Sequence, residues 1–169
     1  KPFAEYLKRA GNQPAIWPVI GPTDKAMTRS YPDGPLLDGE MNDHPHHHSL
    51  WIGADHVHLA MPAHEGRDEI YAYNCYVNDV FQGRAPGRIV ATSLRGENAE
   101  GGFRIVQAVE WRGPVEWGAP EGRLLMTESR RLAVREHRGE ERLDAVDDAP
   151  QVDAELPLAL AQLELPGGA

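Results

Sequence analysis

The sequence predicts a mostly β protein, an antiparallel β-sandwich with long loops and an irregular C-terminal tail. Three observations support this fold class. The chain of 169 residues contains 17 glycines and 14 prolines, which favours many short elements joined by turns. Apolar and polar residues alternate with period two in several stretches. About seven such stretches are separated by turn residues, a pattern typical of a sandwich or a related antiparallel architecture.

The first thirty residues predict a lead-in followed by a hairpin. Apolar residues fall at helical spacing in residues 2–10, which indicates a short helix or an irregular segment that stops at Gly11. Residues 15–20 are apolar but contain Pro18, so we expect an edge strand. Residues 25–29 are expected to form the returning strand of the hairpin.

The middle of the chain combines one long connection with the clearest strands. Residues 30–48 are polar and broken by glycine and proline, and connections of this length are often functional. The alternation of apolar and polar residues is most regular from Phe103 to Trp111, where one side is largely apolar. Five strands are expected here and beyond, over residues 50–59, 70–80, 88–94, 103–111 and 123–135.

The composition changes near Asp144, where the chain becomes rich in alanine, aspartate and leucine. Prolines at 150, 157 and 166 interrupt any helix in this segment. We therefore expect a β-sandwich domain over residues 1–143 and an irregular or poorly ordered tail over residues 144–169.

Charge and hydropathy exclude several classes of partner. The net charge of −9 argues against nucleic acid and anionic membranes, which require clustered lysine and arginine. No apolar run approaches the roughly 18 residues of a membrane-spanning helix, and the N-terminal residues lack the apolar core of a signal peptide. These features predict a soluble protein. The single cysteine, Cys75, excludes an internal disulfide and is expected to be a buried small apolar residue.

A histidine-rich turn is the strongest chemical feature of the sequence. Four of the eight histidines lie between residues 44 and 48, directly after Asp43, and Pro45 stiffens the turn. Imidazole is the commonest metal ligand and titrates near physiological pH, so the turn is a candidate for metal binding or for proton transfer. The alternative is a polar surface turn whose histidines only hydrogen bond to the backbone and stack on Trp51.

A metal site here would use His46 and His48 together with His44 and Asp43, with zinc, manganese, iron or nickel as the ion. In an extended segment His46 and His48 point to one side and His47 to the other. Known metal motifs do not match, however. Ile52 and Gly53 occupy the positions where a cupin has its glutamate, and no His-Glu-x-x-His sequence is present. The sequence therefore does not identify a cofactor, and a divalent metal ion is one option.

Several segments resemble a bacterial family. Residues 16–22, residues 27–32 and above all the Asp-His-Pro-x-His turn at residues 43–51 are similar to the PmoA-like family, a DUF6807-type domain of unknown function. The similarity covers residues 14–136 and includes later strands. Members are often labelled "methane oxygenase". The particulate methane-oxidising enzymes are membrane-bound, and this sequence shows no membrane span, so it does not support the label. The resemblance implies a mutarotase-like supersandwich and a role in sugar catabolism. It also implies that the family's site residues correspond to Asp43, His44 and His47 here.

Three functions follow as expectations. The first is a carbohydrate-active protein, an isomerase, epimerase or lyase, in which His44 and His47 transfer protons and Asp43 orients an imidazole. The second is a metal-dependent oxidoreductase or hydrolase that uses the histidine cluster. The third is a non-catalytic module that binds a sugar-like ligand or a partner through the same loop.

The resemblance also predicts an incomplete scaffold. The family is longer and carries further strands after Arg135, so the change in composition near Asp144 indicates a C-terminally truncated or frame-shifted product. A sheet that lacks strands has open edges, through which we expect self-association.

Overall fold

The fold is mostly β and contains three sheets. The computed structural model describes residues 4–10, 13–21, 23–62, 66–99, 102–116, 118–137, 140–146 and 161–163. The strands are β1 (Ala4–Ala10), β2 (Gln13–Val19), β3 (Leu50–Trp51), β4 (Val57–Pro62), β5 (Asp68–Asn74), β6 (Ala85–Pro86), β7 (Arg88–Ala99), β8 (Gly102–Arg112), β9 (Leu124–His137), β10 (Glu140–Val146) and β11 (Ala161–Leu163). No α-helix occurs among these residues.

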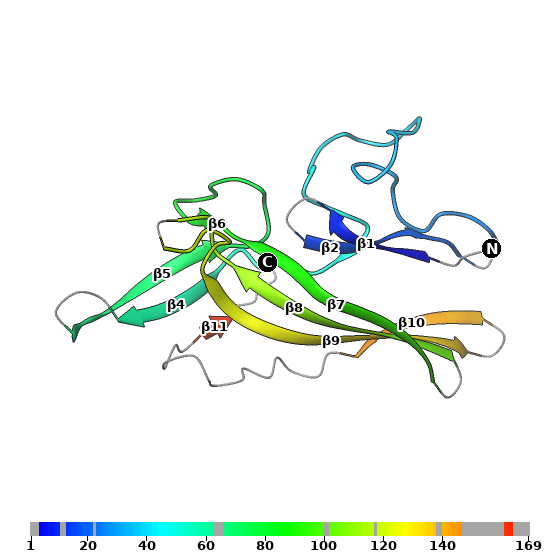
Figure 1. The fold of residues 1–169 in the computed structure, drawn as a ribbon. Helices are drawn as coiled ribbons and strands as arrows, with labels where there is room; N and C mark the ends of the chain where they lie inside the picture. Colours follow the sequence, from blue (N-terminus) through cyan, green and yellow to red (C-terminus); the bar gives the residue numbers. More distant parts are fainter. Residues whose placement is uncertain are drawn as a thin grey trace.

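The longest sheet has the strand order β10-β9-β8-β7, and every pair in it is antiparallel. A second sheet has the order β1-β2-β3 and a third the order β11-β4-β5-β6, in which only β5 and β6 are parallel. Figure 1 shows the long curved strands β7, β8 and β9 running through the molecule, with β4 and β5 toward one end and β1 and β2 nearer the other.

Both smaller sheets pack on the same face of the long sheet. One core joins β4 and β5 to β7, β8 and β9 through buried residues such as Val57, Tyr73 and Val109. The other core packs Ile16 and Val19 of β2 against Leu132 of β9. Ile105 pairs with Leu132 across the sheet, and the odd-numbered residues from Ile105 to Trp111 share one face, so the two cores lie along one surface. The sandwich prediction is therefore confirmed in its main feature, sheets packed face to face around apolar side chains.

A buried polar group separates these two cores. Arg130 donates two hydrogen bonds to the Glu128 carboxylate, at 2.5 and 2.8 Å, and the Trp111 indole donates a third at 2.8 Å. Arg130 is 4% exposed, so its charge is neutralised where water cannot reach it. On this face of the long sheet, buried polar side chains thus lie between two apolar patches.

The structure corrects several predicted elements in the first half of the chain. Residues 4–10 form strand β1 instead of a helix, because they pair antiparallel with β2. That pairing, together with β3, makes β2 the central strand of its sheet and not an edge strand. Residues 25–29 form no strand, and only an isolated bridge joins Ile20 to Ala26.

The predicted strands at residues 50–59 and 70–80 are shorter than expected. The first is divided into β3 and β4, which belong to different sheets, and the second ends at Asn74. The strands predicted within residues 88–135 are present, and each is longer than its pattern indicated. In the predicted tail, β10 continues to Val146 beside β9, and β11 pairs with β4. The rest of that tail lies outside the described residues.

Candidate functional site

The histidine turn lies at the end of the long connection between β2 and β3. The His47 amide donates a hydrogen bond to the His44 carbonyl at 3.0 Å, which closes a tight turn through Pro45. His44 adopts a φ of 47°, a left-handed conformation that costs a residue with a side chain about 1–2 kcal/mol. Contacts elsewhere in the loop must therefore stabilise this turn.

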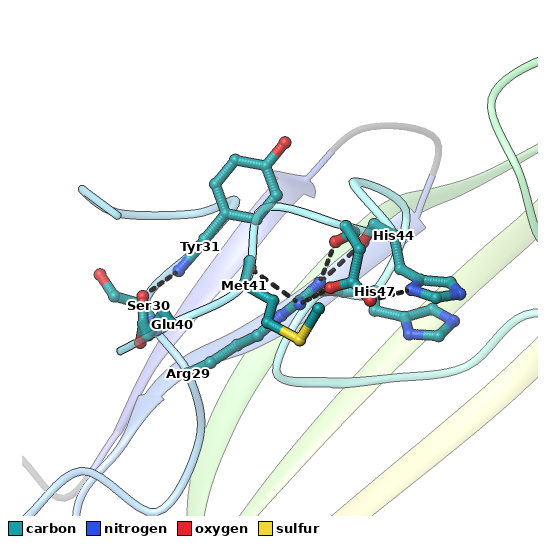
Figure 2. Close-up of polar contacts among 8 residues, drawn as sticks. Arg29, Ser30, Tyr31, Glu40, Met41, His44 and His47 are labelled. Atoms are coloured by element: carbon teal, nitrogen blue, oxygen red, sulfur yellow. Dashed lines mark hydrogen bonds and ion pairs between the residues drawn. The ribbon is translucent and has the colours of Figure 1, made fainter. Parts of the chain in front are cut away.

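Arg29 provides those contacts (Figure 2). Its Nη1 donates to the Asp43 carboxylate at 3.1 Å and to the Met41 carbonyl at 3.4 Å. Its Nη2 donates to the carbonyls of Asp43 and His44 at 3.0 and 2.7 Å, with the His47 carbonyl at 3.5 Å. The planar guanidinium thus holds the backbone on both sides of the strained residue.

Glu40 fixes the loop from which Arg29 extends. Its carboxylate accepts hydrogen bonds from the amides of Ser30, Leu37 and Tyr31, at 2.5, 3.1 and 3.3 Å. These bonds to the charged form lower the pKa of Glu40, with the Ser30 amide as the largest cause. The segment that carries Arg29 is therefore ordered without any regular secondary structure.

Asp43 and His44 form the first acid/base pair of the turn. His44 Nδ1 lies 2.7 Å from Asp43 Oδ2, and both side chains are about half exposed. The hydrogen bond with His44 is the main reason that the pKa of Asp43 is lowered, and Arg29 adds to the effect. In the neutral form of His44, an ionised Asp43 keeps the ring proton on Nδ1, so the lone pair is on Nε2, on the side away from the carboxylate.

His47 and Tyr76 form the second pair. His47 Nε2 and the Tyr76 hydroxyl lie 2.8 Å apart and share a hydrogen bond. Burial lowers the pKa of His47, and the nearby His44 and Arg29 lower it further, so His47 is neutral at neutral pH. The imidazole planes of His44 and His47 are nearly parallel, with ring centroids 4.8 Å apart, which brings the two pairs into one site.

Two buried amides position Tyr76. Gln13 of β2 is 1% exposed, and its Nε2 donates to the carbonyls of Cys75 and Tyr76 at 2.9 and 3.0 Å. The Asn74 carboxamide accepts from the Tyr76 amide at 2.9 Å and donates to the Asp79 carbonyl at 3.0 Å. The loop after β5 is thereby attached to β2, and Tyr76 reaches the histidine turn from a rigid base.

His46 lies beside His47, with ring centroids 4.4 Å apart and the two planes nearly perpendicular. Burial is the main cause that lowers the pKa of His46, and the neighbouring imidazoles of His47 and His44 contribute. Trp51 and Tyr76 lie next to this group, with ring centroids 5.0 Å apart. The site therefore combines imidazoles that stay neutral with an aromatic surface.

His48 belongs to a separate hydrogen-bonded pair. Its Nδ1 lies 2.8 Å from Asp33 Oδ1, and both side chains are almost completely buried. Of the four predicted metal ligands, Asp43, His44 and His46 are close together while His48 belongs to this separate pair. Within the described ranges, no three histidine, cysteine or acidic side chains are grouped so that they could hold a metal ion.

Sequence reasoning identified the turn but missed three residues that organise it. Arg29 lies 14 residues before Asp43, and Tyr76 lies 29 residues after His47. Gln13 is also distant in sequence, and a buried glutamine in a strand has no local signature. Two signals were available: Arg29 lies in residues 27–32, a segment that resembles the family, and asparagine at the end of a strand, as at Asn74, favours a turn held by its own side chain.

Cys75 does not belong to this chemistry. Its side chain is completely buried, and burial raises its pKa to about 12. A thiol in this environment is not a nucleophile. The prediction of a buried small apolar residue is confirmed.

Comparison with known proteins supplies the family context. The model of the "Family of unknown function (DUF6807)" matches residues 1–155. No curated protein and no solved structure matches the chain significantly. In the part of the chain that the structure describes, there is no helix with the length and apolar character required to span a membrane.

Proposed function

Since the chain belongs to the DUF6807 family, whose function is unknown, we propose from its geometry that it transfers protons on a sugar-like substrate. The observation that carries this proposal is the pairing of Asp43 with His44 and of His47 with Tyr76, with the two imidazoles stacked at 4.8 Å. Two adjacent groups that exchange protons are what an isomerase, an epimerase or a lyase requires.

The two pairs have different electrostatic environments, and so different roles. Asp43 holds the His44 proton on Nδ1, so His44 Nε2 is free to accept a proton from the carbon next to a sugar carbonyl. His47 stays neutral because its pKa is lowered, and a neutral imidazole with its tyrosine partner can donate a hydrogen bond to the carbonyl oxygen. The C–H bond breaks, the proton moves to His44, and the electron pair forms an enediolate.

The surroundings of the pairs favour a sugar as the substrate. Trp51 and Tyr76 offer aromatic faces beside the imidazoles, and such faces pack against the C–H surface of a sugar ring. Arg29 donates to five acceptors within the protein, so its charge serves the turn instead of a bound anion. The resemblance to PmoA-like proteins and its sugar context point in the same direction.

Solvent exchange tests the proposal whichever product the protein forms. The protein is incubated in D₂O with a panel of aldoses and ketoses, and proton NMR follows the loss of carbon-bound hydrogen. We expect exchange at the carbon next to the carbonyl, lost in His44→Ala and in His47→Ala. Arg95→Ala is the control, because Arg95 is an exposed residue of β7 with a side chain that is 72% exposed. No exchange with any sugar, or exchange unchanged in both histidine variants, contradicts the proposal.

Parallel measurements on protein purified without a nickel column test the other two candidate functions. Metal-dependent oxidation or hydrolysis through His44, His46, His48 and Asp43 would use Nε2 of His48, because Nδ1 is hydrogen bonded to Asp33, and stoichiometric metal lost in His46→Ala would support it. Stabilisation by a sugar without exchange, retained in His44→Ala, would support a binding module.

A further inference from the structure

A second pair of histidines lies outside the site described above, at the start of β4. Val57 and Leu59 of this strand point into the core and are 2% and 4% exposed. His58 therefore lies on the opposite, outer side; the side chain of His56, the residue directly before β4, is 36% exposed, and the two ring centroids are 6.2 Å apart. We propose that His56 and His58 bind a divalent transition-metal ion such as Zn²⁺ through one nitrogen of each ring. This site is independent of the proposed proton-transfer chemistry.

The carboxylate next to His56 prepares that residue as a ligand. Asp55 Oδ1 lies 2.6 Å from His56 Nδ1, so the ring donates its Nδ1 proton to the carboxylate and keeps Nε2 free for a metal. Asp55 is held in turn by Arg84, whose Nη2 lies 3.5 Å from Oδ2 and 2.9 Å from the Gln82 side-chain oxygen. Arg84 is 9% exposed and therefore well fixed. A carboxylate behind a histidine is the usual outer shell of a metal ligand.

The spacing of the two rings fits a shared ion. With each nitrogen about 2.1 Å from the metal, two imidazole centroids stand roughly 5–6 Å apart over the range of angles that zinc accepts. The observed 6.2 Å is close to this range, and the His56 side chain is 36% exposed and free to rotate slightly. The cross-strand neighbours of His58 are Ala72 of β5, which has a small side chain, and Gln162 of β11.

Coordination by two side chains predicts a site completed by water. Among the residues that the structure describes, no third histidine, cysteine or acidic side chain is grouped with this pair so that it could also ligate the ion, and Asp55 contacts His56 on its other ring nitrogen. Two imidazoles so close in the chain chelate an ion without any rearrangement of the backbone. We therefore expect exchangeable binding of one ion instead of a permanently held structural metal.

Isothermal titration calorimetry with Zn²⁺ alone tests the site on protein purified without a metal-affinity step. His56→Ala and His58→Ala are compared with the wild type and with His46→Ala, which alters only the other histidine cluster. Each β4 variant is expected to lose one equivalent of bound Zn²⁺, while His46→Ala retains that equivalent. Asp55→Asn keeps both ligands and is expected to bind that equivalent about 10–100-fold more weakly.

Far-UV circular dichroism confirms that each variant is folded, and His58→Gln replaces any alanine variant that is not. If both β4 variants bind as many equivalents of Zn²⁺ as the wild type, the proposal is overturned. It is also overturned if only His46→Ala loses the equivalent, because the ion would then belong to the turn.

Discussion

At the scale of single residues, the histidine turn shows how burial and neighbouring charge set protonation. Burial is the largest cause that lowers the pKa of both His46 and His47, and the imidazoles add to one another. A lowered histidine pKa means that the unfolded chain binds protons more readily than the folded protein. The free energy of unfolding therefore has its full value above the histidine pKa of the unfolded chain, about 6.5, and falls as the pH drops below it.

This linkage predicts an acid-sensitive fold. Between about pH 7 and pH 5 the free energy of unfolding should decrease, and the double variant His46→Gln/His47→Gln should show a smaller decrease. Urea denaturation at several pH values measures both slopes. The lowered pKa of Asp43 acts in a different window, below about pH 4, so it does not interfere. Identical slopes in the wild type and the double variant would show that His46 and His47 do not cause the loss of stability in acid.

Arg29 provides the sharpest mutational test of the loop. Arg29→Ala removes the donor that holds the carbonyls around the left-handed His44, and we expect it to cost about 1–3 kcal/mol of stability. Arg29→Lys keeps the charge but not the planar fork, so it should recover only part of the loss. Chemical denaturation measures the difference, with Arg95→Ala as the control. Full recovery with lysine would show that charge alone matters.

The sequence predicted the residues of the turn but not their partners. Asp43 and His44 are neighbours in the chain, so their pairing could be expected from local geometry. The contacts of His47 with Tyr76 and of His48 with Asp33 depend on how distant segments fold back. No periodicity or spacing encodes such contacts, because they join loop residues that meet only once the connections between the strands have folded.

At the scale of elements, alternation was reliable where both faces of a strand have distinct environments. β8 alternates regularly because one face covers the two cores and the other is partly exposed to solvent. Residues 4–10 carried a helical spacing, yet their pairing with β2 overrides that local preference. The division of residues 50–59 into β3 and β4 was not predictable, since a continuous apolar run does not show where a chain changes sheets.

The central strands should carry most of the packing energy. Leu125 of β9 is 2% exposed within the larger core, so Leu125→Ala is expected to cost about 2–5 kcal/mol. Leu94 of β7 is 44% exposed, and Leu94→Ala should stay within about 0.5 kcal/mol of the wild type. The two variants delete the same atoms, and denaturant titration compares them. Equal costs would show that this core does not dominate stability.

At the scale of the whole molecule, the arrangement leaves β7 at one end of the long sheet. Among the described residues, β7 forms its ladder with β8 alone, although it also contacts β1 and β2. Its ladder with β8 contains an irregularity between Ala91 and Ser93, and Arg95 and Glu97 place charges on the exposed half of the strand. Bulges and charges of this kind discourage one sheet edge from pairing with another.

Self-association therefore depends on how well these features protect the edge. We expect the wild-type chain to associate weakly with increasing concentration, and Arg95→Thr/Glu97→Thr to associate more strongly, because the substitutions remove both charges and favour a strand. Sedimentation velocity over a wide range of concentrations measures the change, and Arg67→Thr/Asp68→Thr, with the same charges removed near the start of β5, is the matched control. If the two double variants associate to the same extent, loss of surface charge accounts for the effect and the edge of β7 is not the interface.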